Sequence, residues 1–171
     1  MRIFHVSEES DIAVFEPRAV PSPDTGVTGN AVWAVDEAHL ANYLLPRDCP
    51  RVTYGRGEKT TKEDAAKFVP ANAKRVVIVE SAWLERIDNC TLYLYELPSE
   101  KFDCVDEGAG YFISRTSITP LAKTKLTNLR EALAARGAEV RVEDSLWPAI
   151  DAVAASSLEF SIIRKRNAQP R

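Results

Sequence analysis

Strand-forming runs crowd the middle of this chain instead of alternating with helices, and this pattern restricts its fold class more than any other feature. The most continuous run, at 75–80, contains Val-Val-Ile-Val and is typical of a buried central strand. Further short strands are predicted at 2–6, 31–35, 51–54, 91–97, 101–105, 111–114, 121–126, 138–142 and 158–163. Strands grouped in this way indicate an α+β fold.

Helical patterns occur in four places: 36–45, 61–70, 128–137 and 145–155. Asp36 is predicted to cap the first of them, and Pro46 to end it. Residues 17–30 hold three prolines and two glycines and are predicted to form a long loop. Loops of this length in compact domains are often binding loops.

Length and charge narrow the classes of function. A chain of 171 residues is expected to form a single domain. The net charge of −3 disfavours general nucleic-acid binding, and the cluster Arg164-Lys165-Arg166 is interpreted as a solvated tail. No apolar run approaches membrane-spanning length and no signal-peptide pattern opens the chain, so we expect a cytoplasmic protein. Three scattered cysteines and two histidines predict neither a disulfide framework nor a metal site.

Several polar residues are candidates for chemistry, each with a plainer structural role as the alternative. His5, within an apolar strand, could bind a ligand hydroxyl or act as a base, or could bond to backbone. Cys49, between Arg47 and Arg51, could be a nucleophile or a packed thiol. The two arginines could clamp an anion or pair with nearby carboxylates. Glu107, in a glycine-rich turn before Tyr111, could serve as an acid–base or charge-stabilising group.

The order of the first motifs resembles the ADP-ribosyltransferase-like fold of the histidine-tyrosine-glutamate type. The resemblance rests on Ile3-Phe4-His5-Val6-Ser7, then Val32-Trp33-Ala34, then Tyr43 in a following helix. The later run Gly110-Tyr111-Phe112-Ile113-Ser114, followed by Ile118-Thr119-Pro120-Leu121, is similar to a later strand pair of that fold. The stretch from Arg115 to Leu121 is similar to a motif of the rifampicin-modifying transferases.

This resemblance implies a split mixed β-sheet flanked by helices over residues 1–126, with a C-terminal helix-strand-helix-strand extension over 127–171. It also implies NAD as the ligand, without a metal. The implied contacts are His5 and Ser7 to ribose and nicotinamide, Trp33, Tyr43 and Tyr111 as aromatic contacts, and Arg18 or Arg47 to the pyrophosphate. The position that carries the catalytic glutamate in such enzymes falls near Gly110, so the implied catalytic residues are His5 and the nearest acid, Glu107.

As a whole, the chain is similar to an uncharacterised bacterial family of unknown function. The shared runs are Phe-His-Val-Ser, Val-Trp-Ala-Val-Asp, Leu-Pro-Arg-Asp-Cys-Pro and Asp-Glu-Gly-Ala-Gly-Tyr. Three hypotheses follow. The chain is an NAD-dependent transferase-like enzyme, or a non-catalytic module that binds a nucleotide or another small anion on the same scaffold, or an enzyme that uses Cys49 as its nucleophile. The oligomeric state is left open.

Overall fold

The computed structural model of the protein describes residues 1–19 and 26–171. The stretch 20–25, part of the loop predicted at 17–30, lies outside the described residues. The chain divides into two compact units. The first unit comprises Met1–Leu40 and Leu92–Leu126, and the second comprises Ala41–Thr91 and Thr127–Arg171. The chain therefore passes from one unit to the other after Leu40, after Thr91 and after Leu126.

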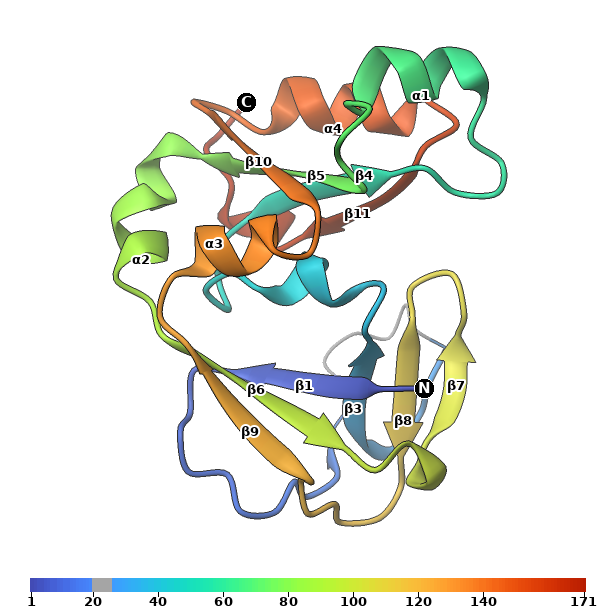
Figure 1. The fold of residues 1–171 in the computed structure, drawn as a ribbon, viewed down its shortest axis with the longest axis vertical. Coiled ribbons are helices and arrows are strands. Elements are labelled where there is room, and N and C mark those ends of the chain that lie inside the picture. Colours follow the sequence, from blue (N-terminus) through green and yellow to red (C-terminus); the bar gives the residue numbers. More distant parts are fainter. Residues whose placement is uncertain (20–25) are drawn as a thin grey trace. The chain divides into compact units, whose positions relative to one another are not determined.

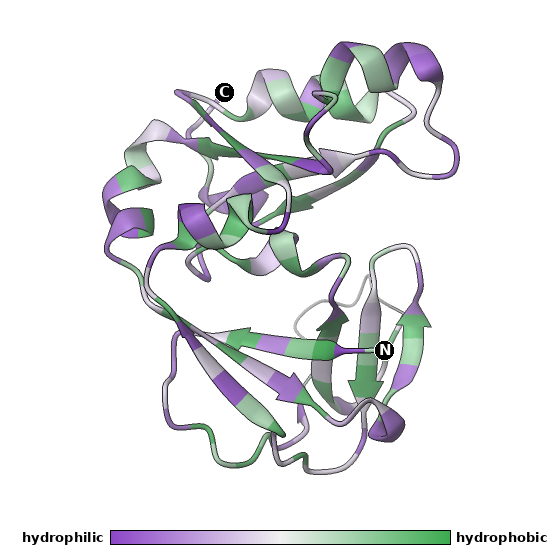
Figure 2. Cartoon of the chain, in the orientation of Figure 1, coloured by the Kyte–Doolittle hydropathy of each residue, from purple (hydrophilic) through white to green (hydrophobic). Residues whose placement is uncertain are grey.

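The first unit is built around an antiparallel sheet in the strand order β7-β8-β3-β1-β6-β9, with β2 beside β3 (Figure 1). Along β6 hydrophobic and more hydrophilic residues alternate, as expected for a strand with one face toward the core (Figure 2). Its strands are β1 Ile3–Ser7, β2 Arg18–Ala19, β3 Asn30–Asp36, β6 Leu92–Leu97, β7 Asp103–Asp106, β8 Tyr111–Ser114 and β9 Ala122–Leu126.

Strand β1 pairs with β3 over only the first part of its length. Their ladder contains only the pairs Ile3↔Asp36 and Phe4↔Val35, whereas β1 and β6 stay paired from Ile3 to Ser7. Phe15 and Ile118 form an isolated β-bridge. Both residues belong to a hydrophobic core with Ile3, Tyr95 and Phe112. The first sheet is therefore partly split between β1 and β3.

The second unit has a four-stranded mixed sheet in the order β10-β5-β4-β11, with only β10 and β5 parallel. Helices α1 and α4 cover one face, where Val52, Val76, Ile150 and Val153 pack together (Figure 1). Helix α3 packs against β10 and α2. The elements are β4 Arg51–Gly55, α1 Lys62–Phe68, β5 Arg75–Glu80, α2 Leu84–Asp88, α3 Leu129–Ala134, β10 Ala138–Glu143, α4 Trp147–Ala154 and β11 Glu159–Ile163.

The α+β class is confirmed, with two sheets and four α-helices among the described residues. Two helix starts follow the expected capping chemistry: Thr61 accepts from the backbone N–H of Asp64 at 3.2 Å, and Asn128 accepts from that of Glu131 at 3.1 Å. The first unit's sheet is antiparallel throughout its described strands, and the mixed pairing occurs in the second unit.

The helix predicted at 36–45 is wrong. The chain there forms a turn and then one short 3₁₀ helix, Leu40–Tyr43. Asp36 uses its carboxylate on the N–H of His39, three residues on, which fixes a tight turn at the start of the segment. Pro46 then leaves too few residues for a helix to propagate.

Candidate functional site

His5 is the central residue of β1 and lies where the β1–β3 ladder has ended. Its Nδ1 is 2.8 Å from the carbonyl oxygen of Trp33. A carbonyl can only accept, so Nδ1 carries the proton, and Nε2 is the basic nitrogen of the neutral ring. The ring of His5 also lies against that of Phe15, with centroids 4.8 Å apart. The side chain is half-buried and held in one orientation across the split.

His5 and Trp33 nevertheless use opposite faces of the sheet. Val32 and Ala34 flank Trp33 in β3 and both join the core that contains Phe15, which His5 contacts. Because successive strand residues point to opposite faces, Trp33 points away from the side that carries His5. The structure therefore does not bring the predicted contacts of β1 and those of β3 onto one surface.

Trp33 shares its own face with Tyr111. The two rings meet edge to face, 5.8 Å between centroids, and their strands pair through Val35↔Tyr111 and Trp33↔Ile113. The indole Nε1 of Trp33 is buried and has no hydrogen-bond partner among the described residues.

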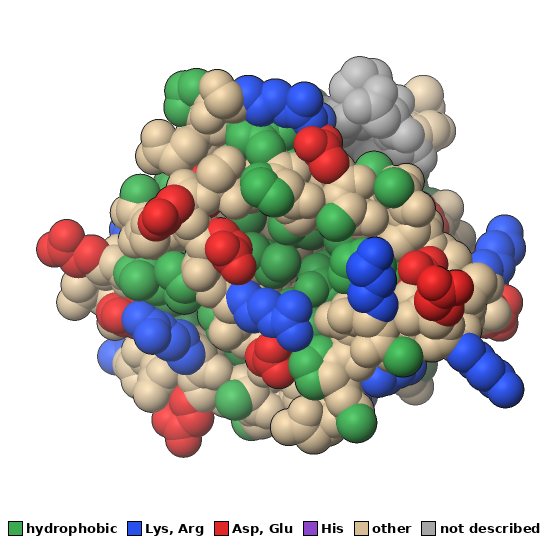
Figure 3. Space-filling model, turned by 90° about the horizontal axis from the view of Figure 1, so that it is seen from above, with side chains coloured by type: hydrophobic (Ala, Val, Ile, Leu, Met, Phe, Trp, Pro, Cys, Tyr) green, Lys and Arg blue, Asp and Glu red, His purple; other side chains and the backbone are tan. Residues whose placement is uncertain are grey.

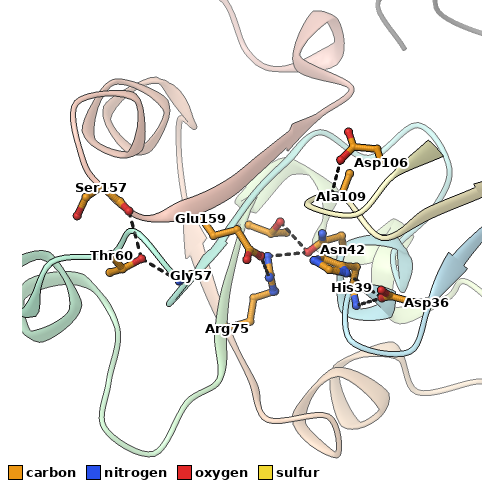
Figure 4. A network of polar contacts seen from close by, with 11 residues as sticks. Asp36, His39, Asn42, Gly57, Thr60, Arg75, Asp106, Ala109, Ser157 and Glu159 are labelled. Carbon is orange, nitrogen blue, oxygen red and sulfur yellow. Dashed lines mark hydrogen bonds and ion pairs between the residues drawn. The ribbon is translucent and has the colours of Figure 1, made fainter. Parts of the chain in front are cut away.

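Asp36 and His39 form a compact pair at the end of β3, and Figure 4 shows the carboxylate turned to the ring. Oδ1 of Asp36 accepts from the backbone N–H of His39 and lies 2.8 Å from its Nδ1. Their side chains are only 19% and 14% exposed. The carboxylate fixes the tautomer, so Nε2 is again the basic nitrogen of the neutral ring. This pair was not among the predicted site residues, because Asp36 was expected to cap a helix; the three-residue spacing of an acid and a histidine after a strand was the available signal.

Gly110 is the residue that makes room for this pair. The turn before β8 places the backbone of Gly110 next to Asp36. The backbone N–H of Asp36 donates to the Gly110 carbonyl at 3.0 Å. A Cβ at position 110 would collide with Nδ1 of His39 and lie 2.7 Å from Oδ1 of Asp36. Gly110 also has a φ of +67°, in the left-handed region that favours glycine. A glutamate cannot be accommodated at this position in the present arrangement.

The other predicted residues of the first unit are spread over separate elements. Glu107 is exposed in the turn between β7 and β8, where its carbonyl accepts from the N–H of Gly110 at 3.3 Å. Ser7 ends β1 half-buried, and its Oγ accepts from the N–H of Glu9 at 3.1 Å. Arg18 is exposed in β2, opposite Ala31 of β3. An open depression of about 300 Å³ lies beside Ile12, Tyr95 and Lys123, and none of the predicted residues lines it.

Tyr43 and Arg47, the remaining predicted contacts, belong to the second unit. Tyr43 is half-buried in the 3₁₀ helix, and the exposed Arg47 offers its carbonyl to Nε of Arg164 at 3.1 Å. Arg164, part of the basic cluster, also lies 3.7 Å from a carboxylate oxygen of Asp48. On the face in Figure 3, Lys and Arg side chains are interspersed with Asp and Glu.

Arg51 and Cys49 have structural roles. Arg51 is 3% exposed and donates to the carbonyls of Asn42, Pro46 and Cys49 at 3.1, 3.2 and 2.7 Å. It thus holds the 42–49 segment together and is not positioned as an anion clamp. Cys49 is fully buried, and burial raises the pKa of its thiol to about 12 despite the nearby charge of Arg51. A thiol protonated at neutral pH is a poor nucleophile, which disfavours the third hypothesis.

A buried polar network spans the sheet of the second unit (Figure 4). Oδ1 of Asn42 accepts from Thr53 at 2.8 Å and from Arg75 at 3.2 Å, and Arg75 pairs with Glu159. Glu80 is likewise buried at the end of β5, where it accepts from the N–H groups of Leu146 and Gln169. These side chains have hydrogen-bond partners within the second unit, so we interpret the network as one that stabilises the fold.

No three His, Cys, Asp or Glu side chains among residues 1–19 and 26–171 gather into a group that could hold a metal ion. In the same ranges, none of the helices has the length and apolar character needed to span a membrane.

These features define an α+β protein of two units, with a strand histidine and an aspartate–histidine pair in the first. The chain belongs to DUF6886, a family of unknown function, whose model matches residues 4–168. Membership in a family of unknown function, expected from the sequence runs, is therefore confirmed. Comparison with curated proteins and with solved structures finds no match. The resemblance to ADP-ribosyltransferases stays a prediction.

Proposed function

We propose that the first unit binds a nucleotide of the NAD class, as the resemblance to ADP-ribosyltransferase-like folds implies. The observation that carries the proposal is the orientation of His5. Its Nδ1 is held by the carbonyl of Trp33 at the split between β1 and β3, so the basic Nε2 is the group to which a ribose hydroxyl would donate. A polar side chain held in one rotamer on a rigid strand is the arrangement that ligand recognition needs.

The proposed contact residues lie on two opposite faces of the first unit's sheet. His5 and Ser7 would meet the ribose on the side of the Phe15 core. Trp33 and Tyr111 form a separate pair of aromatic rings on the other side. We assign the nucleotide to the His5 side, because the histidine there is oriented by a hydrogen bond. Arg18, which also belongs to the first unit, stays a proposed contact of the pyrophosphate.

Binding is better supported than ADP-ribosyl transfer. Position 110 cannot hold a glutamate beside Asp36 and His39, and Glu107 is exposed in a turn. For the transferase alternative, Glu107 is the proposed charge-stabilising residue. The alternative is a non-catalytic module that recognises a nucleotide or a small anion on the same scaffold.

Calorimetric titration of the full chain with NAD tests the proposal. We expect saturable binding that His5→Ala weakens about tenfold or more, since one hydrogen bond to a ligand is worth on the order of 1–2 kcal/mol. His5→Asn, whose amide can still donate to the Trp33 carbonyl, separates loss of the ligand contact from loss of the strand contact. Lys125→Ala, on the exposed strand β9, is the matched surface control and should bind normally.

Parallel titrations with ADP and with pyrophosphate distinguish the two functions. Binding of pyrophosphate as tight as that of NAD would favour the small-anion module. Absence of heat and of a thermal shift with millimolar NAD, in a folded protein, would refute the proposal.

A further inference from the structure

The sheet of the first unit ends in two edge strands that carry opposite charges. Strands β7 and β9 lie at the two ends of the strand order, and each pairs with a single strand among the described residues (Figure 1). Every side chain of β7 is exposed, as are those of β9 apart from the half-buried Leu126. The charged side chains of β7 are Asp103 and Asp106, and those of β9 are Lys123 and Lys125. An exposed edge presents backbone N–H and C=O groups with which a further strand can pair.

The charges restrict which strand each edge can accept. Two β9 strands side by side would place lysines next to lysines, and two β7 strands would place aspartates next to aspartates. Like charges on neighbouring strands are destabilising, so neither edge favours a copy of itself. The β9 edge favours an acidic strand instead. Among the described strands, β7 is exposed at every residue and carries two carboxylates without a basic side chain, so β7 of a second copy fits this edge.

The two pairs of charges also have matching spacing. The lysines of β9 are two residues apart and therefore point to one face of the sheet. The aspartates of β7 are three residues apart, but a register shift between Cys104 and Asp106 compensates for the extra residue. Asp103 lies opposite Ile113 of β8. Asp106 lies opposite Tyr111, two residues earlier on the same strand. The aspartates therefore share one face as well, and both pairs repeat at about 7 Å.

The faces on which the charges lie determine the orientation of the second copy. Lys123 is opposite Tyr95, which belongs to the core with Phe15. On β7 it is Cys104 that lies opposite a member of that core, Phe112, so the aspartates point to the other face. Neighbouring strands are antiparallel all the way across the six-strand order, so β7 and β9 run in opposite directions. A second copy therefore brings its aspartates to the lysines when it is turned over, with its β7 parallel to β9.

We propose that β9 of one copy accepts β7 of a second copy as a parallel strand, with the aspartates of β7 beside the lysines of β9. The existing contacts leave capacity for this pairing. Nζ of Lys123 donates to the Ser10 carbonyl at 2.6 Å, and an ammonium group has further N–H donors. Oδ1 of Asp106 accepts from the Ala109 N–H at 3.0 Å, and a carboxylate can accept several hydrogen bonds. None of the residues proposed to bind the nucleotide belongs to these two strands, so the inference is independent of the proposed function.

The interface joins two different surfaces and is therefore heterologous. After one pairing, the first copy still presents its β7 edge and the second its β9 edge, so pairing can continue into open chains of copies. Both strands are short, so the buried area is small and the association is weak. Because the charges are exposed, salt weakens the association further.

Sedimentation velocity of the full chain over a concentration series measures this association. We expect the weight-average mass to rise with concentration up to about 1 mM, the range in which small interfaces associate. Raising the salt concentration from about 0.05 M to about 0.5 M should weaken the association about tenfold or more, because it shortens the screening length several-fold. A constant monomer mass over the whole series at low salt overturns the proposal.

Exchange of the charges tests which strands pair. Lys123→Glu with Lys125→Glu makes both edges acidic, and Asp103→Lys with Asp106→Lys makes both edges basic. We expect each double variant alone to lose the association, and an equimolar mixture of the two to regain it, because each edge then meets its complement in the other variant. A mixture of folded variants that stays monomeric overturns the pairing, as does association of either variant alone at the native strength.

The matched control separates strand pairing from net charge. Lys59→Glu with Lys62→Glu makes the same change in charge at exposed positions of the second unit. This variant should associate as the native chain does. A loss equal to that of the β9 variant would refute specific pairing of the edges.

A cross-link tests the parallel register without altering any charge. With Asp103 beside Lys123, the register places Cys104 of one copy beside Thr124 of the next, at the spacing of about 5 Å that a disulfide can bridge. A mild thiol oxidant should therefore link the Thr124→Cys chain into disulfide-bonded dimers and longer chains. Adding Cys104→Ser should remove these species. Equal cross-linking without Cys104, or none in a Thr124→Cys chain that associates, overturns the proposed arrangement.

Discussion

The backbone of Gly110 lies so close to the imidazole of His39 that a Cβ atom at position 110 would overlap Nδ1 of that ring. We therefore expect Gly110→Ala to destabilise the protein by about 2–4 kcal/mol, through left-handed strain of roughly 1 kcal/mol and displacement of the buried pair. Gly26→Ala is the matched control, because Gly26 has the same φ of +67° and no atom of the described residues lies within 4 Å of a Cβ placed there. Chemical denaturation of both variants measures the difference, and equal losses would contradict the steric argument.

The effect of a glutamate introduced at position 110 can also be predicted. Gly110→Glu places the residue expected of a histidine-tyrosine-glutamate transferase at the corresponding point of the chain. We expect this variant to lose stability and the NMR signature of the His39–Asp36 pair, without gaining ADP-ribosyl transfer, because the side chain would occupy the space of that pair. Transfer of ADP-ribose by a stably folded Gly110→Glu variant would show that the pair can move aside.

Cys49 provides a test of thiol reactivity. Cys49 and Cys90 are buried, and Cys104 is exposed on β7. In the native protein we expect a thiol reagent at pH 8 to modify one cysteine per chain quickly, and all three after denaturation. Cys104→Ser should abolish the fast reaction. Modification of Cys49 at a rate similar to that of Cys104 would revive the nucleophile hypothesis.

The same thiol makes stability depend on pH in the alkaline range. Burial raises the pKa of Cys49 from its ordinary value of 9.0 to about 12. The folded state therefore retains a proton that the unfolded state loses between these values, so the contribution of Cys49 is complete below about pH 9 and is lost as pH rises toward 12. Cys49→Ala should show a smaller loss of unfolding free energy than the native chain between pH 8 and pH 11. Identical pH profiles would contradict the raised pKa.

Local rules predicted the fold better than the site. The buried run at 75–80 became β5 with the expected bounds, and the caps at Thr61 and Asn128 formed because each depends on neighbours in the sequence. The helix predicted at 36–45 does not form, because the hydrogen bond from the His39 N–H to the Asp36 side chain competes with helix formation. Such competition is settled by the tertiary position of Gly110, seventy residues away, which no local pattern contains.

Strand alternation could have corrected part of the predicted site. Residues 32, 33 and 34 were expected in one strand, so the side chain of Trp33 had to point to the face opposite those of its two neighbours. The face to which His5 points depends instead on the register of β1 with β3 and β6. That register is a long-range property. His5 and Trp33 could therefore be predicted as candidates from their residue types, whereas the placement of their side chains on opposite faces depends on strand pairing.

Arg51 is predicted to be a strong determinant of stability in the second unit. Arg51→Met removes the donor from three buried carbonyls, those of Asn42, Pro46 and Cys49, and we expect a loss of about 3 kcal/mol or more. Arg130→Met is the control, because Arg130 pairs with Asp88 on the surface and should change stability by less than about 1 kcal/mol. Comparable losses from both substitutions, measured by denaturant unfolding, would show that the carbonyl contacts of Arg51 contribute little.

Asp64 reports on the contact between α1 and the segment before β11. Its Oδ2 accepts from the hydroxyl of Ser157 at 2.5 Å and from the Ser157 backbone N–H at 2.7 Å, and these bonds hold the pKa of Asp64 below its ordinary value. Because hydrogen bonds to the charged form favour ionisation, Ser157→Ala should raise the pKa of Asp64 toward 3.8, with the backbone bond keeping part of the shift. The sign of the linkage follows: Asp64 stabilises the folded state above its unfolded pKa, and this contribution disappears as pH falls through the lower folded value. NMR titration of the Asp64 carboxyl carbon in the native chain and in Ser157→Ala measures the change. An unchanged Asp64 titration in Ser157→Ala would assign the lowered pKa to the remaining contacts, the backbone of Ser157 and the Thr61 hydroxyl.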